Sequence, residues 1–259
     1  LNRWNAFADL YERHFFVWSQ PALYSAISAL SLSSVDSAEC NVLSVGCGPG
    51  QDIAAIRAHA PQCKLVALDY SSEMIAKATV RAATHNAEAR VDDAQSLATV
   101  GSCSVDRLLS NLCIHIVPDA DKSISAFFRA LKPGGCLCAS VWGSQSASSQ
   151  FTLFPRALAK CRERGDIPKD ENAQNAVRSN FHMGQDDVEL RKRFSDAGFE
   201  RVTSWHVQCV WPEGGTGPGR AFAESWVTSA VDAAKLMEKL TEEQQASVLV
   251  ELASLADDV

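Results

Sequence analysis

The sequence predicts an α/β fold in which a mostly parallel sheet is covered by helices on both faces. Between residues 41 and 143, short apolar segments of strand length alternate with longer segments in which apolar residues recur at helical spacing. The short segments are nearly continuous apolar runs, which is typical of parallel strands buried on both faces. With 259 residues, the chain is long enough for one sizeable domain.

Residues 1–40 are expected to form a helical cap. Within residues 4–18, apolar side chains recur at three- and four-residue spacing, among them Trp4, Phe7 and Tyr11. Pro21 predicts a break, because a proline inside a helix removes a backbone hydrogen bond. A second helix is expected over 22–30.

Residues 41–143 are expected to hold five strands and their connecting helices. The expected strands cover 42–46, 64–69, 89–94, 105–113 and 136–142, and the expected helices cover 52–60, 73–87 and 119–132. Ser71 or Ser72 can cap the second of these helices, because a serine hydroxyl accepts a hydrogen bond from a free N–H group there. The Pro-Gly-Gly segment at 133–135 is expected to end the third helix.

Residues 144–259 are expected to add late strands and a helical lid, so that 1–259 form a single domain. Helical periodicity covers 151–163 and 186–199, and an alternating pattern predicts a strand over 200–211. The segment 212–219 is rich in glycine and proline, which indicates a loop, and we interpret its glycines (214–219) as a linker. Two helices are expected from residue 220 onward.

Composition and charge exclude several classes of function. The net charge is −7 and no Lys/Arg run occurs, so we expect a small-molecule substrate and no nucleic-acid partner. No apolar stretch approaches the roughly 20 residues needed to cross a bilayer. The nine cysteines are odd in number and include no C-x-x-C pair, which favours free, buried thiols in a reducing, cytoplasmic compartment and no metal site. The chain begins at Leu1, so a removed targeting segment stays possible.

The segment "VLSVGCGPGQD" (42–52) is the first candidate binding motif. A strand, a glycine-rich turn and a helix place backbone N–H groups at the end of an α/β sheet where ligands bind. Dinucleotide-binding proteins have the pattern G-x-G-x-x-G. Here Gly46, Gly48 and Gly50 give G-x-G-x-G, and Gln51 stands where the dinucleotide pattern has its third glycine. The spacing therefore disfavours a nicotinamide dinucleotide.

Acidic residues follow the next two expected strands. Asp69 lies 23 positions after Gly46, and its carboxylate can accept hydrogen bonds from both hydroxyls of a ribose. Tyr70 can pack beside an adenine. Asp93 can accept a hydrogen bond from the adenine amino group, and Ala94 leaves room for the ring.

Taken together and in this order, the motifs resemble those of class I S-adenosylmethionine-dependent methyltransferases. The resemblance covers residues 41–143, and "VDRLLSNLCIHIVPD" and "FFRALKPGGCLCASVW" are typical of the small-molecule branch, which includes quinone-biosynthesis, trans-aconitate and malonyl-carrier-protein methyltransferases. It implies a Rossmann-like, doubly wound sheet of seven strands, with S-adenosylmethionine as cofactor, S-adenosylhomocysteine as product and no metal. The cofactor-binding residues that it implies, some of them supported by the reasoning above, are Gly46, Cys47, Gly48, Gly50, Asp69, Tyr70, Asp93, Ala94, Asn111, Leu112 and Tyr11.

Ser44 departs from the family pattern. Methyltransferases of this class usually have Asp or Glu at this position, and that acid helps to orient the methionine end of the cofactor. The residues therefore leave two further hypotheses beside an active enzyme: a methyltransferase-like protein that binds or assembles without catalysis, and an NAD(P)-dependent oxidoreductase.

His115 is the candidate general base, because it follows the fourth expected strand and a neutral imidazole can accept a proton. A packing or capping histidine is the alternative. His14, His182 and His206 are weaker candidates, and His206 is expected to be structural. Aromatic side chains could line an acceptor pocket, although residues at helical spacing also form cores. The aromatic candidates are Trp4, Phe15 and Trp18 in the N-terminal cap and Trp211, Phe222 and Trp226 in the lid. Asn111 could instead cap a local turn.

Overall fold

A computed structural model describes residues 4–5, 8–9, 11–12, 16–169, 181–209, 218–229 and 231–258. The chain divides into two compact units, which we describe separately. The first comprises Leu1–Gly143 and Ser179–Cys209, and the second comprises Ser144–Arg178 and Val210–Val259. The single-domain organisation expected from the sequence stays a prediction.

The first unit is built on a parallel sheet with the strand order β3-β2-β1-β4-β5. Its strands are β1 (Asn41–Val45), β2 (Lys64–Asp69), β3 (Glu88–Val91), β4 (Val105–Asn111) and β5 (Leu131–Ser140). The α/β class and the parallel sheet are thus confirmed. The expected count of seven strands is wrong for the described residues, which form five.

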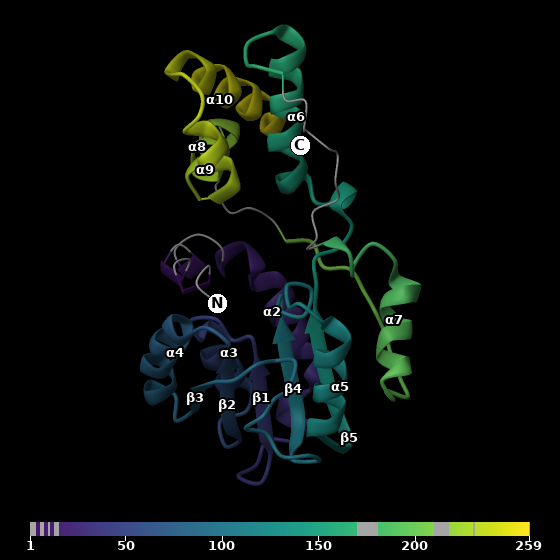
Figure 1. Cartoon of the computed structure of the whole chain (residues 1–259). Coiled ribbons are helices and arrows are strands. Elements are labelled where there is room, and N and C mark those ends of the chain that lie inside the picture. The colour runs from purple at the N-terminus through teal and green to yellow at the C-terminus, as the bar shows by residue number, and fades with distance from the viewer. Residues whose placement is uncertain are drawn as a thin grey trace. The chain divides into compact units, whose positions relative to one another are not determined.

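Helices cover both faces of this sheet (Figure 1). They are α2 (Phe16–Leu30), α3 (Gln51–His59), α4 (Ser72–Thr84), α5 (Ala120–Ala130) and α7 (Asp187–Asp196), with a short 3-10 helix, η2, at Leu32–Ser34. Successive residues of β1 enter different cores. Val42 packs with side chains of α2, α3 and α4, whereas Leu43 packs with side chains of α5. Burial of alternate strand residues on opposite faces explains the continuous apolar runs.

The strand order makes the carboxyl end of β1 the topological switch point of the sheet, the place where open α/β sheets bind ligands. β1 pairs with β2 on one side and with β4 on the other, so the connections leave it in opposite directions. β1 and β2 end together, with Val45 opposite Leu68. The chain then turns so that the N–H groups of Gly46 and Cys47 both donate to the Leu68 carbonyl, at 2.8 and 3.0 Å. This geometry fixes the glycine turn against the end of β2.

Three local expectations in the first unit are wrong. Pro21 lies inside α2 and does not break it, since the buried Leu23, Ile27 and Leu30 hold the helix against the sheet. β5 begins at Leu131, so the segment 133–135 belongs to the strand and not to the end of a helix. Residues 201–209 pair with no strand. Their alternating pattern corresponds to no buried face, and Trp205 is 47% exposed.

The second unit is helical in its described residues. It contains η3 (Gln145–Ala147), α6 (Ser149–Arg164), α8 (Pro218–Ser229), α9 (Val231–Met237) and α10 (Glu242–Asp257). The two helices expected after residue 220 are therefore three. The expected loop is contradicted at its end, because 218–219 begin α8 and the Gly219 N–H donates to Asp257 Oδ1 at 2.8 Å, while 212–217 lie outside the described residues.

The nine cysteines are free, as expected, and six of them are buried. Within the described ranges, none of the helices combines the length and apolarity that a bilayer span requires.

Candidate active site

The glycine turn follows β1 and has a backbone that only glycine adopts easily. Gly46, Gly48 and Gly50 have φ angles of +73°, +54° and +82°. A Cβ atom at Gly46 would collide with the side chain of Cys113, and one at Gly50 would lie 2.9 Å from Ala78. The close approach of β4 and α4 therefore explains two of the three glycines without a ligand.

Asp69 ties the turn to the end of β2. Its two carboxylate oxygens accept from the Gly48 N–H and the Ser71 N–H, both at 2.9 Å. Burial raises the pKa of Asp69, while hydrogen bonds from the backbones of Ser71, Gly48 and Tyr70 oppose the increase. Each oxygen of a carboxylate can accept a second hydrogen bond, so the side chain can still receive two hydroxyls. Tyr70 beside it is 52% exposed.

The N-terminal segment brings Tyr11 to the turn. Tyr11 Cε1 lies 3.6 Å from the position that a Cβ atom of Gly48 would take. Burial raises the pKa of Tyr11, and the nearby charges of Asp69 and Asp52 raise it further. Glu12, the next residue, forms ion pairs with Lys77 and Arg81 of α4. Tyr11 therefore lies beside Gly48, and its predicted role in binding the cofactor stays a prediction.

Asp93 and Ala94 follow β3, but they differ in exposure. Asp93 Oδ1 accepts from the Gln95 backbone N–H at 2.9 Å and from Gln95 Nε2 at 3.2 Å. Ala94 is buried in the core cluster that contains Leu43. The sequence analysis did not single out Asp92, which is buried and accepts from Asp93, Ala98 and Thr99. Asp92 shapes the loop from which Asp93 projects.

Asn111 and Leu112 lie where β4 ends. The Leu112 N–H donates to the carbonyl and the hydroxyl of Ser140, at 3.1 and 2.9 Å. Ser140 Oγ in turn donates to Asn111 Oδ1 at 2.6 Å. Leu112 has a φ of +51°, an uncommon conformation for a residue with a side chain. These bonds give Asn111 a local structural role and occupy the Leu112 N–H group.

Comparisons with known proteins agree with this arrangement. The sequence profile of the methyltransferase domain family matches residues 42–135. A malonyl-[acyl-carrier protein] O-methyltransferase of Xylella fastidiosa is 35% identical over 46% of this chain and 40% of its own length. A trans-aconitate 2-methyltransferase of Deinococcus radiodurans is 33% identical over 52% and 50%. The chain contains a class I S-adenosylmethionine-dependent methyltransferase domain. It spans about half the length, or less, of these two relatives.

Solved structures share the fold of the methyltransferase domain. A chain in the complex of the Haloferax volcanii Trm112 methyltransferase activator with a methyltransferase has a TM-score of 0.58 at 19% identity, over 88% of this chain and 92% of that chain. The [4+2]-cyclase SpnF has a TM-score of 0.52 at 18% identity, over 92% and 74%. At these identities the similarity concerns the fold alone.

The residues of the turn fit S-adenosylmethionine. Gly48 leaves an open approach to the backbone beside Tyr11, and Asp69 keeps acceptor capacity for ribose hydroxyls. A buried carboxylate oxygen, Asp52 Oδ1, has no hydrogen-bond partner in the described part of the chain. An unpaired acceptor of negative charge beside the turn suits a cationic ligand.

Asp52 is a buried residue beside the glycine turn to which the sequence analysis assigned no role. It lies in the first turn of α3 and is 7% exposed. Ser44 Oγ donates a short hydrogen bond to Asp52 Oδ2. Burial raises the pKa of Asp52 to about 6, although the Ser44 hydroxyl and the backbone of Asp52 and Ile53 lower it. The sequence offered one signal for Asp52. It is an acid that lies eight residues after Ser44, the position where the family usually has an acid.

His115 is 2% exposed and packs against Trp142, with a ring-centroid distance of 5.3 Å. Trp142 packs in turn against Phe181. Among the described residues, His115 Nδ1 has no hydrogen-bond partner. Burial lowers the pKa of His115 to about 3, with a smaller contribution from His182. The imidazole is therefore neutral at physiological pH, which both the proposed base and a packing histidine require.

The other aromatic and histidine candidates separate into distinct environments. His206 lies on the surface and pairs with Asp187 at 3.0 Å, in place of the expected strand position. Trp226 and Phe222 stack on each other in the interior of the second unit, where Trp226 is 1% exposed. These two side chains pack in the core of their own unit, and the expectation that they cover an acceptor stays a prediction. Trp4 is half-buried. The side chains of His14, Phe15, Trp18 and Trp211 lie outside the described residues.

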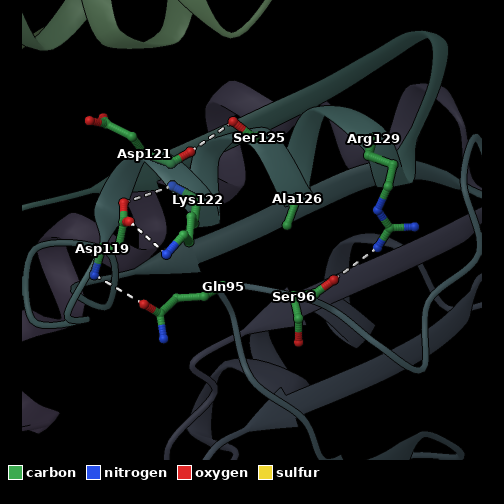
Figure 2. Close-up of a pocket in the computed structure, with 8 residues that line it drawn as sticks. All are labelled: Gln95, Ser96, Asp119, Asp121, Lys122, Ser125, Ala126 and Arg129. Carbon is green, nitrogen blue, oxygen red and sulfur yellow. Dashed lines mark hydrogen bonds and ion pairs between the residues drawn. The ribbon is translucent and has the colours of Figure 1, made fainter.

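A surface pocket of about 580 Å³ lies between the segment at Gln95 and α5 (Figure 2). Its polar groups largely bond to one another: the Asp119 N–H donates to Gln95 Oε1 at 3.1 Å, and Lys122 pairs with Asp119. Arg129 donates to the Ser96 carbonyl at 3.1 Å. The residues of the glycine turn do not line this pocket. Gln95 connects this pocket to the candidate adenine-binding residue Asp93, because its side-chain amide also donates to Asp93 Oδ1.

Proposed function

We propose that the protein transfers a methyl group from S-adenosylmethionine to a small-molecule acceptor. The observation that carries the proposal is the Asp69 carboxylate, which holds the glycine turn through Gly48 and stays able to accept the ribose hydroxyls. The names of the curated relatives, a malonyl-carrier-protein and a trans-aconitate methyltransferase, support an acceptor of small size.

In this proposal, the residues of the chain bind the cofactor and orient its methyl group. When bound, the sulfonium cofactor supplies an activated methyl group, so the protein acts mainly by positioning it and excluding water. Asp69 would hold the ribose, Asp93 the adenine amino group, and Tyr11 would cover the turn at Gly48. His115 is the candidate to accept a proton from an acceptor that carries one, but burial lowers its pKa and makes the imidazole a weaker base than an exposed histidine. No group of three or more metal-ligating side chains occurs within the described ranges.

Electrostatics disfavours the oxidoreductase alternative. A dinucleotide presents a doubly charged pyrophosphate to the glycine turn and to the helix that follows it. In this chain that helix begins with the buried Asp52, and Asp69 lies close enough to raise the Asp52 pKa. The Asp52 carboxylate at the start of this helix repels a pyrophosphate, whereas Asp69 can bind a ribose in either cofactor class and does not discriminate between them.

A second candidate is a methyltransferase-like protein that binds the cofactor or a partner without catalysis. Ser44, in place of the usual acid, favours it. Similarity of the fold to the [4+2]-cyclase SpnF also means that fold alone does not identify the reaction. Where the second candidate binds the cofactor, both candidates use the same turn, and only methyl transfer separates them.

Calorimetry with S-adenosylmethionine and S-adenosylhomocysteine tests the binding step. We expect micromolar binding that is lost in Asp69→Ala and kept in Asp196→Ala, an exposed carboxylate paired with Lys192. Circular dichroism must show that Asp69→Ala remains folded. Binding of neither ligand by the wild-type protein would refute both cofactor-based candidates, and tight binding of NADH would favour the oxidoreductase.

A methyl-transfer assay tests the second step. Labelled S-adenosylmethionine is incubated with a panel of phenols, carboxylates, amines and quinones. Transfer to a member of the panel supports the enzyme. Cofactor binding with no transfer to any member favours the non-catalytic candidate.

A further inference from the structure

We propose that Asp52 supplies the carboxylate that binds the α-ammonium group of the cofactor's methionine half, in place of the acid that position 44 lacks. This inference rests on the proposed function, since it names a residue of the same cofactor site. It concerns the last residue of the 42–52 segment, to which the sequence analysis assigned no role.

The position of the carboxylate is the first argument. Ser44 is the fourth residue of β1 and Asp52 is the second residue of α3, and the glycine turn joins the two elements. The hydrogen bond from Ser44 Oγ to Asp52 Oδ2 shows that the helix carboxylate reaches the side chain of the strand residue. Asp52 therefore places an acid beside the location that the usual acid would occupy.

The second argument is the unpaired oxygen. Asp52 Oδ1 is buried and has no hydrogen-bond partner among the residues that the structure describes. No Lys, Arg or His of those residues forms an ion pair with Asp52. An unsatisfied buried polar group is costly, and a charged one more so. A donor from outside the chain would remove this cost.

The third argument is the kind of donor that fits. The charges of Asp69 and Asp52 both raise the pKa of Tyr11, so the turn carries two carboxylates close together. An ammonium group has three donors and a positive charge, which matches them. Divalent hard cations need about six oxygen ligands, more than these two side chains offer. The backbone of Asp52 and Ile53 at the start of α3 stabilises the charged carboxylate, but this helix-start role gives the buried Oδ1 atom no hydrogen-bond partner among the described residues.

Calorimetry with two ligands tests the assignment. S-adenosylhomocysteine carries the α-ammonium group, and 5′-methylthioadenosine lacks it while keeping the adenosine. Asp52→Asn is expected to bind S-adenosylhomocysteine about 30-fold more weakly than the wild-type protein, which corresponds to about 2 kcal/mol. Binding of 5′-methylthioadenosine is expected to change less than threefold. The matched control is Asp121→Asn, an exposed carboxylate that pairs with Arg193.

Exchange of the two side chains gives a second test that keeps the volume of the pair. Asp52→Ser is expected to lose affinity for S-adenosylhomocysteine, and the double variant Ser44→Asp/Asp52→Ser is expected to regain most of it. Recovery supports a carboxylate that acts on the ligand from either position. A folded double variant that stays as weak as Asp52→Ser contradicts the assignment.

The outcomes separate this inference from the proposed function. A wild-type protein that binds neither ligand refutes both. Wild-type binding that Asp52→Asn leaves unchanged refutes the role of Asp52 alone. Equal losses for both ligands also refute it, because a merely structural carboxylate would affect the adenosine half as much as the methionine half.

Discussion

Replacing Asp52 with asparagine is expected to stabilise the ligand-free protein. The wild-type carboxylate has a pKa of about 6 in the folded chain against an ordinary value of 3.8, chiefly because of burial. At about 1.4 kcal/mol for each tenfold change in acidity, folding loses about 3 kcal/mol at pH 8 because Asp52 must be ionised. Asparagine keeps the shape and carries no charge, so it avoids this loss.

The pH dependence gives the sign of the stability difference between Asp52→Asn and the wild-type protein. Below pH 3.8 the side chain is protonated in both the folded and unfolded states, and the two proteins should be about equally stable. As pH rises through about 6, the wild-type protein loses the stability that the protonated group contributes, and asparagine does not. At about 2–4 °C for each kcal/mol, the variant should melt about 6–12 °C higher at pH 8.

Thermal unfolding between about pH 3 and pH 8 measures the difference in stability between Asp52→Asn and the wild-type protein, and Asp92→Asn is a matched control. Asp92 is as buried as Asp52. Burial acts to raise the pKa of Asp92, but hydrogen bonds from Thr99, Asp93 and Ala98 outweigh it and lower the pKa. Asp92→Asn should therefore destabilise the folded protein at pH 7. The stability difference from wild type should vanish as pH falls below the ordinary carboxyl pKa of 3.8. An Asp52→Asn protein that is less stable than wild type at pH 8, or a difference that does not vary with pH, refutes the reasoning.

Three further predictions concern other parts of the first unit. Gly46→Ala should lower the free energy of unfolding in urea by about 3 kcal/mol, because of its positive φ and the collision with Cys113. Gly134→Ala, which also has a positive φ but open space around it, should lower it by about 1 kcal/mol. Equal losses for the two variants would contradict the packing argument. His115→Ala should lower turnover while calorimetry shows unchanged cofactor affinity, and unchanged turnover would leave His115 a packing residue. Arg57→Lys should lower the free energy of unfolding by about 2 kcal/mol, because the guanidinium donates to five backbone carbonyls that an ammonium cannot reach together. A loss below about 0.5 kcal/mol in thermal unfolding would show that these hydrogen bonds do not stabilise the fold.

The central strands could be predicted from the sequence because their boundaries are local. β1 and β2 are apolar runs that end at a glycine and at an acid, and β2 matches its expected bounds. The Ser71 cap was also predictable, and the structure shows its hydroxyl accepting from the Met74 N–H at 3.2 Å. Each of these features depends on a few neighbouring residues, which is the range that sequence patterns describe.

Features that depend on tertiary packing could not be predicted in the same way. Pro21 ends no helix, because the buried face of α2 outweighs one missing backbone hydrogen bond. Trp226 was expected in a lid segment, and its ring packs against Phe151 and Phe222 of its own unit, contacts that no sequence pattern indicated. In both cases the deciding contacts come from residues far away in the chain, and a periodic pattern does not state which face another element covers.

The candidate site shows the same division between local pattern and spatial arrangement. The glycine spacing and Asp69 follow from a strand, a turn and the next strand, and the structure brings Asp69 to the Gly48 N–H. A sequence motif checks one position at a time. At position 44 it finds serine, so the motif indicates that the acid is missing. The chemistry of a cation site requires a carboxylate at a place in space, and the start of α3 reaches the same place as the end of β1. A substitution in a motif therefore argues against activity only after the neighbouring element has been searched for the group that the motif lacks.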